Sequence, residues 1–336
     1  MTEDADQRIV WDKGKKRKRS RLRKAVSRNI GYAVLRALHA VVSRLPLRAG
    51  RACSWVAGTI AYALCARERK IALDALGRVY SSERSPVEIR ALARDVFRHT
   101  GSIGIDWMIL RRWSREKIAR TFPDLVKDIH LAHEAVKSAG GGMVGITAHL
   151  GNWEILSLVC AHFVPGLLVP IAQRLYFQKY QDFLHYLRTS HGNQVIYTDE
   201  SPRKMIRALR DGCLLGFLPD QDIRTNRGVF VDFFGLPAWT VTFPVGLARR
   251  ENVKMFFAVV VREGRGFRLV HRGPFDVLST DDEDADLLAG TQLWTGVLEE
   301  EIRKHPEQWS WLHPRWRTKP EKPRVKVDRT IKAPPA

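Results

Sequence analysis

The pattern of apolar and polar positions changes after a glycine run at 140–142. From there on, short apolar segments typical of strands alternate with longer segments whose apolar spacing indicates helices. The expected strands are 143–148, 167–172, 193–198, 214–218, 255–263 and 266–273, and the expected helices are 153–163, 177–191, 202–211, 241–250 and 283–304. This alternation predicts an α/β fold with a mixed, mostly parallel sheet flanked by helices, in which the last two strands pair as a hairpin across Gly264.

The chain before residue 136 is expected to form an N-terminal helical region. Residues 68–135 are rich in Arg, Ala, Leu and Glu, and a helix-start signal stands at 85–88. Between 29 and 45, apolar residues recur at spacings of three and four, which predicts an amphipathic helix that Pro46 ends. These residues are Ile30, Val34, Leu38, Val41 and Leu45. The basic residues at its ends leave two interpretations: a helix in a membrane interface, or a helix packed on the domain.

Composition adds an expectation about partners. Hydrophobic residues make up 45% and charged residues 27% of the chain, ordinary globular values that indicate neither a disordered chain nor a polytopic membrane protein. The 56 Lys and Arg residues against 36 Asp and Glu give a net charge of +20. Such a surplus suits nucleic acid, an anionic membrane, or an acidic protein or phosphorylated substrate, and charge alone does not choose among them.

The predicted organisation has four parts. A basic arm at 1–28 is expected to be disordered, and a membrane-associated helical region follows at 29–135. The α/β core at 136–318 forms one catalytic domain with the preceding helices, and 319–336 is a proline-containing tail.

No signal peptide is apparent, and the apolar run at 54–66 is shorter than the ~20 residues of a spanning helix. The four cysteines lack zinc-site spacing and are expected to be buried, reduced thiols; they are Cys53, Cys65, Cys160 and Cys213.

The stretch "GITAHLGNWE" at 145–154 contains the candidate chemistry. His149 follows a predicted strand, at the edge where open α/β sheets form their ligand crevice. Asn152 is a suitable helix N-cap, and Glu154 falls in the first turn of the next helix. A carboxylate beside an imidazole can hold its tautomer and stabilise the imidazolium, so the pair predicts a general base. The nucleophile would then be a hydroxyl of the substrate, with Gly151 and the N–H groups of the helix start as candidate oxyanion donors.

Three segments together resemble the late acyltransferases of lipid A biosynthesis, the lauroyl and myristoyl transferases of the lysophospholipid acyltransferase superfamily. The segments are "HLGNWE" (149–154), "LPDQDIRTNRGVFVDFFG" (218–235) and "HPEQWSWLHPRWRTKP" (305–320). The resemblance implies a glycerol-3-phosphate acyltransferase-like fold and an enzyme at the cytoplasmic face of the cell inner membrane. Such an enzyme moves a fatty acyl group from an acyl carrier protein thioester to a hydroxyl of a lipid A precursor or related glycolipid.

The resemblance also implies the site residues. His149 would be the base and Glu154 its support, with Arg174 as a candidate for an anionic group of the acceptor. The remaining candidate substrate-binding positions are Gly151, Asn152, Asp220, Gln221, Asp222, Gly228 and Phe230. For Asp220 and Asp222 a structural role in the turn after the strand at 214–218 stays open beside catalysis. The aromatic residues of the motifs suit a core or the lining of an acyl chain.

Neither a metal nor a resident cofactor is expected, because metal-ligand spacings and nucleotide-binding glycine motifs are absent. Coenzyme A stays open as the donor, and a phospholipid or other lysolipid stays open as the acceptor. A different class, a basic nucleic-acid-binding protein that uses Lys13–Lys24, is the competing interpretation, although no nucleic-acid partner is expected of an acyltransferase.

Overall fold

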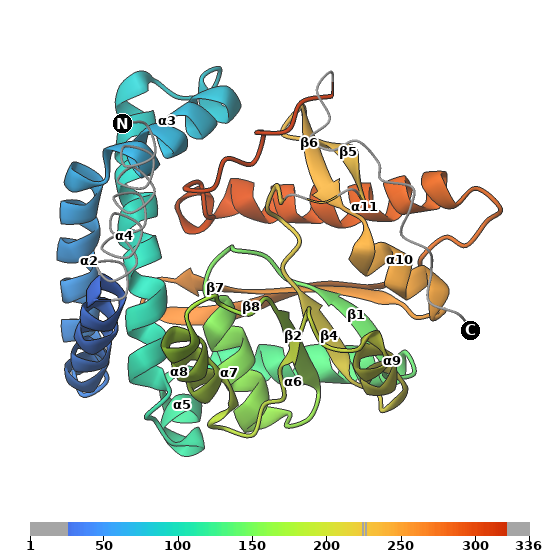
Figure 1. Cartoon of the computed structure of the whole chain (residues 1–336), viewed down its shortest axis with the longest axis horizontal. Helices are drawn as coiled ribbons and strands as arrows, with labels where there is room; N and C mark the ends of the chain where they lie inside the picture. The colour runs from blue at the N-terminus through green and yellow to red at the C-terminus, as the bar shows by residue number, and fades with distance from the viewer. Residues whose placement is uncertain (1–25, 224, 226, 321–336) are drawn as a thin grey trace, which may run out of the picture.

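The structure, a computed structural model, describes residues 26–320 except 224 and 226 (Figure 1). Most of the basic arm at 1–28 and of the tail at 319–336 therefore lies outside the described residues. A six-stranded sheet has the strand order β3-β2-β4-β1-β7-β8. Its strands are β1 (Met143–Ile146), β2 (Leu168–Ala172), β3 (Ile196–Tyr197), β4 (Leu214–Phe217), β7 (Met255–Glu263) and β8 (Gly266–Phe275). All neighbouring pairs are parallel except the antiparallel β7 and β8, so the predicted α/β class and the hairpin across Gly264 are confirmed.

The sheet is covered on both faces. Strand β7 shows this most clearly, because every residue from Met255 to Val261 is buried. Met255, Phe257, Val259 and Val261 face one hydrophobic core, and the alternating Phe256, Ala258 and Val260 face the other. A strand buried on both faces reads as a continuous apolar run, and this explains why the sequence identified β7 with its bounds.

Helices form one layer on each face of the sheet (Figure 1). One core includes residues of α5 (Arg115–Thr121), α6 (Pro123–Ser138), α7 (Trp153–Phe163) and α8 (Gln178–Thr189). The other core includes residues of α3 (Ala66–Tyr80), α9 (Pro202–Arg210), α10 (Phe243–Arg250) and α11 (Glu283–Lys304). Helix α4 (Pro86–Leu110) supplies residues to both, so the helical region and the sheet share their cores.

The second layer includes a two-stranded antiparallel ribbon that the pattern did not predict. Its strands are β5 (Gly228–Phe233) and β6 (Leu236–Val241). Phe234 and Gly235 between them have φ values of 58° and 70°. Positive φ at both turn residues is the conformation of tight hairpins whose twist matches that of the strands. After α11, the 3₁₀ turn η1 (Pro306–Gln308) packs against α4, and the side chain of Gln308 hydrogen-bonds the backbone of Arg262 in β7.

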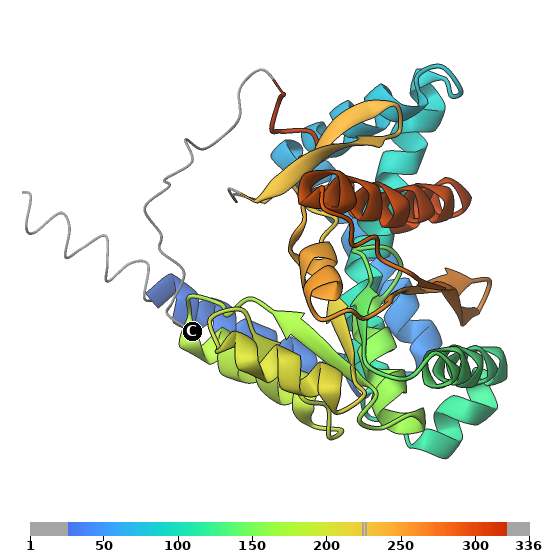
Figure 2. The ribbon, with the colours of Figure 1, turned by 90° about the vertical axis from the view of Figure 1, so that its right-hand side faces the viewer.

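The N-terminal helices form a wall at one end of the sheet (Figure 1). Residues 26–42 are helical, and α2 (Leu47–Leu64) packs along α4. Helix α4 begins with a capping box in which Ser85 and Glu88 satisfy each other's backbone N–H groups. The helix 26–42 lies alongside α8, with the rings of Tyr32 and Tyr180 5.9 Å apart (Figure 2).

The predicted apolar stripe of helix 26–42 does not face the domain. Ile30, Val34, Leu38 and Val41 are 52–62% exposed, whereas Tyr32, Leu35, Val42 and Leu45 pack against the core. The helix also ends before Leu45, since 43–45 form a turn and bend. It is therefore packed on the domain by one face and leaves a second apolar face uncovered among the described residues.

No described helix is long and apolar enough to cross a bilayer. The expectation of buried cysteines is wrong for Cys53 and Cys65, which are exposed, because they lie on α2 and at its end rather than in either core. Cys160 is buried and Cys213 is half-buried.

Candidate active site

The turn after β1 is fixed by backbone hydrogen bonds on both sides. Thr147 N donates to the carbonyl oxygen of Phe217 at 2.8 Å, and Asn152 N donates to that of Val260 at 2.7 Å. Gly151 has φ +65°, and a Cβ there would lie 2.0 Å from the carbonyl oxygen of Val260. Only glycine fits this close approach. The backbone hydrogen bonds on both sides of the turn set the position of His149.

His149 is held by Asp220, which follows β4. The ring Nδ1 lies 2.7 Å from Asp220 Oδ1, and the backbone N–H of His149 donates to Asp220 Oδ2 at 2.9 Å. Trp309 Nε1 donates to the same Oδ2 at 2.9 Å. Asp220 is 1% exposed, whereas the His149 side chain keeps 22% exposure. The carboxylate is thus fully enclosed and the imidazole can be reached from solvent.

This geometry fixes the tautomer of the imidazole. An ionised carboxylate only accepts hydrogen bonds, so Nδ1 carries the proton and Nε2 keeps the lone pair. Burial lowers the pKa of His149, but the charge and hydrogen bond of Asp220 outweigh it and raise the pKa above 6.5. Burial raises the pKa of Asp220, and the contacts with His149 and Trp309 outweigh that and lower it. The pair is therefore arranged as an oriented base whose protonated form is stabilised.

Glu154 does not take the predicted place beside the imidazole. Its two oxygens accept from Arg188 Nε of α8, both at 3.2 Å, and Arg188 Nη2 donates to Oε1. Burial lowers the pKa of Arg188, but the charge of Glu154 outweighs it and raises the pKa. The partner of His149 is Asp220 because the end of β4 lies beside the end of β1, whereas the first turn of α7 places Glu154 towards α8. Glu154 still contributes a charge that raises the pKa of His149.

Asn152 and Gly151 have structural roles in this arrangement. Asn152 is the predicted N-cap, since its Oδ1 accepts from Ile155 N at 3.1 Å, and its Nδ2 donates to the carbonyl oxygen of Ile103 of α4. The N–H of Gly151 donates to the carbonyl oxygen of Gln308 at 3.0 Å, so the prediction that it serves as an oxyanion donor is wrong. The N–H groups of Trp153 and Glu154, in the first turn of α7, remain candidates.

The closing segment is braced by Asp222, which is fully buried. Its oxygens accept from Thr318 N at 2.7 Å and from Thr318 Oγ1 at 3.0 Å, and its carbonyl accepts from Arg317. The structure thus gives Asp222 a structural role, while Asp220 both braces the turn and orients His149. Gln221 between them is half-buried.

Three further residues that were predicted to bind substrate make contacts away from His149 and Asp220. Gly228 pairs with Val241 in the ribbon, where a Cβ would lie 2.8 Å from the ring of Trp239. Phe230 stands on the same ribbon, edge-to-face with Trp239 at 5.0 Å. Arg174 is exposed and forms ion pairs with Asp199 and Glu200, so two carboxylates already neutralise the guanidinium that was predicted to bind an anion.

Sequence reasoning missed three residues that support the site. Arg188 neutralises Glu154, and His99 of α4 donates from Nε2 to the carbonyl oxygen of Gly151 at 3.1 Å. Trp309 was identified only as core or lining, yet its indole N–H binds Asp220. Trp309 could have been identified as a site residue because it lies in the motif at 305–320. No motif around Arg188 or His99 indicates that they contact the site.

No group of three or more His, Cys, Asp or Glu within the described part of the chain is arranged to hold a metal ion. His149 and Asp220 lie at the carboxyl ends of two central strands, beside the start of α7.

Similarity to known proteins decides the class of this site. A family profile described as bacterial lipid A biosynthesis acyltransferase matches residues 13–318. The chain belongs to this family. The resemblance seen in the three motifs is confirmed, and the motifs that carry it meet in space at His149, Asp220 and Trp309.

Curated relatives of the family differ in the acceptor that their names state. A phosphatidylinositol mannoside acyltransferase of Mycobacterium tuberculosis (strain ATCC 25618 / H37Rv) is 29% identical over 60% of this chain and 63% of its own length. A lipid A biosynthesis lauroyltransferase of Escherichia coli (strain K12) is 27% identical over 65% of this chain and 68% of its own. A lipid A biosynthesis acyltransferase of Haemophilus influenzae is 25% identical over 65% of this chain and 66% of its own. The match thus spans less than two thirds of the length of the mycobacterial relative.

Proposed function

We propose that this protein is an O-acyltransferase that moves a fatty acyl chain from a thioester to a hydroxyl of a glycolipid. One observation carries the proposal: an enclosed carboxylate, Asp220, holds the imidazole of His149 by Nδ1 and leaves Nε2 free to take a proton. Membership of the family gives this base its reaction class.

The reaction follows from the orientation of the imidazole. Nε2 takes the proton of the acceptor hydroxyl as its oxygen attacks the thioester carbonyl, and Asp220 stabilises the imidazolium that forms. The oxyanion of the tetrahedral intermediate is placed near the helix start, where the N–H groups of Trp153 and Glu154 can donate. When the intermediate collapses, the C–S bond breaks and the imidazolium returns its proton to the leaving thiolate. The products are an ester and a free thiol.

Replacement of the base tests this mechanism. His149→Ala is expected to lower the rate of acyl transfer by about 10²–10⁴-fold, the usual contribution of general-base catalysis. The thermal unfolding midpoint should stay close to that of the wild type. His130→Ala, a histidine on the exposed side of α6, is the matched control. A His149→Ala variant that turns over at the wild-type rate removes the proposed mechanism.

The donor is proposed to be an acyl carrier protein, with coenzyme A as the second candidate. The net charge of +20 suits an acidic carrier protein through electrostatic steering. Incubation of the purified protein with radiolabelled acyl carrier protein or acyl coenzyme A, each in turn, identifies the donor by transfer of label to lipid.

The acceptor is proposed to be a lipid A precursor or a related glycolipid at the cytoplasmic face of the inner membrane. The relatives named above act, by their names, on lipid A or on phosphatidylinositol mannoside. Parallel reactions with these two acceptors and with a lysophospholipid, read by mass spectrometry of the labelled product, separate the three classes.

The competing interpretation, a basic nucleic-acid-binding protein, predicts a different effect of removing the basic arm at 1–28. Removal of residues 1–28 would abolish the main activity of such a protein, whereas the acyltransferase is expected to retain the chemistry of its base. Acyl transfer and RNA retention, measured on the same truncated protein, distinguish the two classes.

A further inference from the structure

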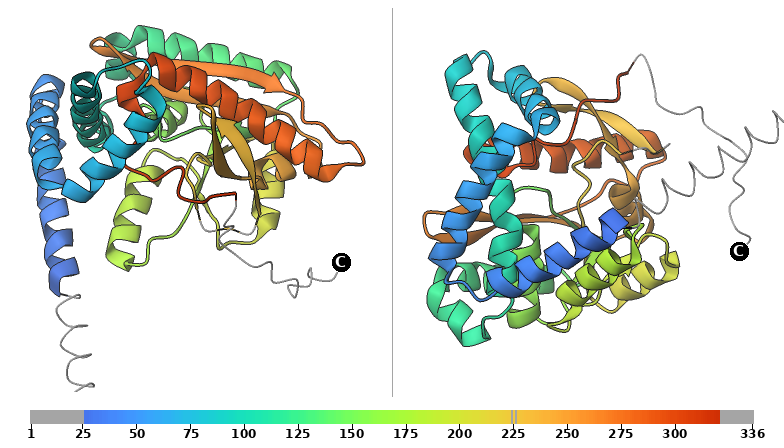
Figure 3. Two further views of the ribbon diagram at one scale, coloured as in Figure 1. Left: turned by 90° about the horizontal axis from the view of Figure 1, so that it is seen from above. Right: turned by 60° about the vertical axis from the view of Figure 1, so that its left-hand side comes forward.

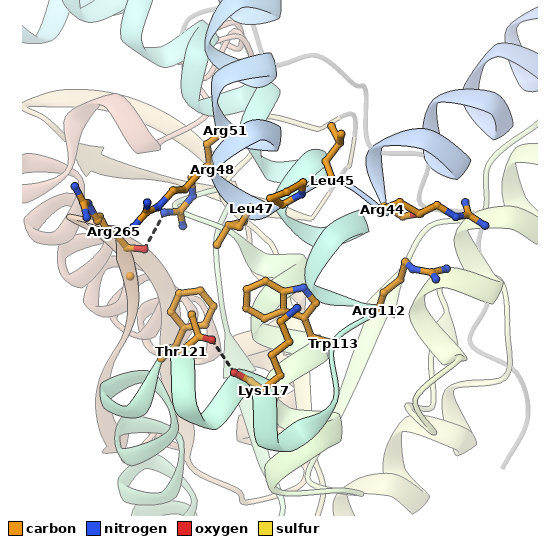
Figure 4. A pocket seen from close by; sticks show the side chains of 14 residues that line it. Arg44, Leu45, Leu47, Arg48, Arg51, Arg112, Trp113, Lys117, Thr121 and Arg265 are labelled. Atoms are coloured by element: carbon orange, nitrogen blue, oxygen red, sulfur yellow. Dashed lines mark hydrogen bonds between the residues drawn. The ribbon is translucent and has the colours of Figure 1, made fainter.

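A cavity of about 1120 Å³ lies where helix 26–42 meets α2, away from the pair of His149 and Asp220 (Figure 4). We refer to it as the junction cavity. It is lined by residues 43–48, 51, 112, 113, 117, 121, 122, 265 and 266. These residues come from the turn before α2 and the start of α2, the segment between α4 and α5, helix α5 and its C-cap, and the turn between β7 and β8.

The lining of the junction cavity carries only positive charge. Six of its fourteen residues are cationic, and none is Asp or Glu; the six are Arg44, Arg48, Arg51, Arg112, Lys117 and Arg265. Of these six, only Arg51 has a carboxylate within 4 Å among the described residues. Six neighbouring cations that share so little negative charge repel one another, and a bound anion would relieve this.

Arg51 is only partly satisfied by its neighbours. Its Nη1 donates to the carbonyl oxygen of Arg265 at 2.8 Å, but its Nε and Nη2 are buried without a hydrogen-bond partner among the described residues. The carboxylate of Asp106 is 3.6 Å from Nε and is shared with Arg262, which hydrogen-bonds it. Nε thus has an ion-pair partner at long distance, whereas Nη2 has none among the described residues. Buried donors usually find partners, so Nη2 marks a place for an external acceptor.

The start of α2 adds further donors. Pro46 is its N-cap, no side chain caps it, and its first turn contains no acidic residue. The first intrahelical bond is donated by Gly50, so the N–H groups of the first turn lack intrahelical acceptors. Pro46, Leu47 and Arg48 line the cavity, and a helix N-terminus of this kind favours an anion such as phosphate.

The surroundings of the cavity are apolar on both sides. Ile30, Val34, Leu38 and Val41 of helix 26–42 are exposed, and so are Trp55, Val56 and Ile60 of α2, at 50–53%. Both helices lie on one outer face of the molecule, which comes forward in the right-hand view of Figure 3. Exposed apolar side chains beside cations match a bilayer interface, where apolar side chains enter the acyl boundary and cations meet headgroup phosphates.

We propose that the junction cavity binds the phosphate of an anionic membrane lipid and thereby seats helix 26–42 and α2 on the bilayer. An acidic carrier protein would match the charge equally well, but the apolar residues on both sides favour a lipid. The proposal is independent of the acyl-transfer reaction, because binding can be measured without donor or acceptor.

Two charge-reversal variants of the full-length protein provide the test. Arg48→Glu/Lys117→Glu changes two cavity cations, and Arg203→Glu/Arg210→Glu makes the same change on α9, at the opposite end of the molecule from α2 (Figure 1). The probe is monomeric dihexanoyl phosphatidylglycerol, titrated calorimetrically against each protein. We expect saturable binding of one lipid, weakened about tenfold or more in the cavity variant and less than about threefold in the α9 variant.

Further measurements cover the remaining outcomes. In sedimentation with vesicles of phosphatidylglycerol and phosphatidylcholine, the cavity variant should again lose more binding than the α9 variant. With vesicles of phosphatidylcholine alone, the two variants should not differ in this way. Equal losses in both variants would mean diffuse attraction and overturn the proposal, as would inorganic phosphate that binds as tightly as the lipid. Loss of acyl carrier protein binding with lipid binding retained would assign the cavity to the protein instead. If Arg48→Glu/Lys117→Glu unfolds, Arg48→Gln/Lys117→Gln is measured in its place.

Discussion

At the scale of single residues, Asp220 determines what His149 can do. The carboxylate binds the imidazole, the backbone N–H of His149 and the indole of Trp309, and it is 1% exposed. An enclosed carboxylate with three donors stays ionised and fixes the ring in one tautomer. The carboxylate that orients the histidine is therefore 71 positions away, and in the proposed mechanism it takes the place of the acidic residue five positions along the chain.

Replacement of Asp220 by asparagine is expected to change both the rate and its pH dependence. Asp220→Asn keeps the size of the side chain but removes the charge that raises the pKa of His149, so burial is left to lower that pKa. The base acts when neutral, so wild-type kcat/KM rises with pH through a pKa above 6.5. In the variant this limb moves to lower pH, and the plateau falls by about 10²–10⁴-fold. An unchanged limb in the kcat/KM profile would contradict the role of Asp220.

Gly151 permits a test of the backbone beneath His149. Gly151→Ala places a Cβ at positive φ against the carbonyl oxygen of Val260, and it is expected to lower the free energy of unfolding by about 2–4 kcal/mol. Gly166→Ala is the matched control, because Gly166 has φ +82° but open space around it, and should cost only about 1–2 kcal/mol. Urea unfolding of both variants gives the comparison, and equal losses would show that the contact with Val260 is not tight.

At the scale of elements, Glu154 and Arg188 connect α7 to α8. The Glu154 side chain is 10% exposed and that of Arg188 is 23% exposed, so removal of either partner leaves a poorly solvated charge. Glu154→Gln or Arg188→Met is expected to cost about 1.5–3 kcal/mol of unfolding free energy. The double variant should recover part of this loss, as a double-mutant cycle will show.

Activity provides the second readout for this ion pair. If Glu154 acts on α8 and only at a distance on His149, Glu154→Gln should lower kcat by less than about tenfold, far less than Asp220→Asn. The exposed ion pair between Arg207 of α9 and Asp211 at its C-cap is the control for stability, with an expected effect below about 0.5 kcal/mol. A Glu154→Gln variant as inactive as Asp220→Asn would return Glu154 to the catalytic role that the motif implies.

The elements differ in how far the sequence could predict them. The pattern identified α7, α11 and β7 with their bounds, because each has a regular apolar period and clear ends. It missed β5 and β6, although a glycine in a two-residue turn between apolar runs was a signal for a hairpin. The pairing of Asp220 with His149 could not be predicted from spacing, because it depends on β1 and β4 being neighbours in the sheet.

At the scale of the whole molecule, the sequence predicted the amphipathic helix but left open whether its apolar stripe meets the domain or a membrane interface. A helical period shows that one face is apolar, yet it does not say whether that face meets protein or another apolar phase. In helix 26–42 a second set of residues, including Tyr32 and Leu35, meets the domain, and this leaves the predicted stripe exposed. Together with the charge of +20, the uncovered stripe favours a membrane surface as the partner.

The stripe leads to a prediction that differs from that of the junction cavity. Val34→Gln/Leu38→Gln should weaken binding to vesicles about tenfold or more, since each half-exposed apolar side chain contributes roughly 1 kcal/mol when it enters the acyl boundary. The loss should appear with neutral and anionic vesicles alike, because no charge is changed. The unfolding midpoint should stay unchanged, since both side chains are more than half exposed. Leu131→Gln, at 53% exposure on α6, is the control, and an equal loss in that variant would remove the stripe as the membrane contact.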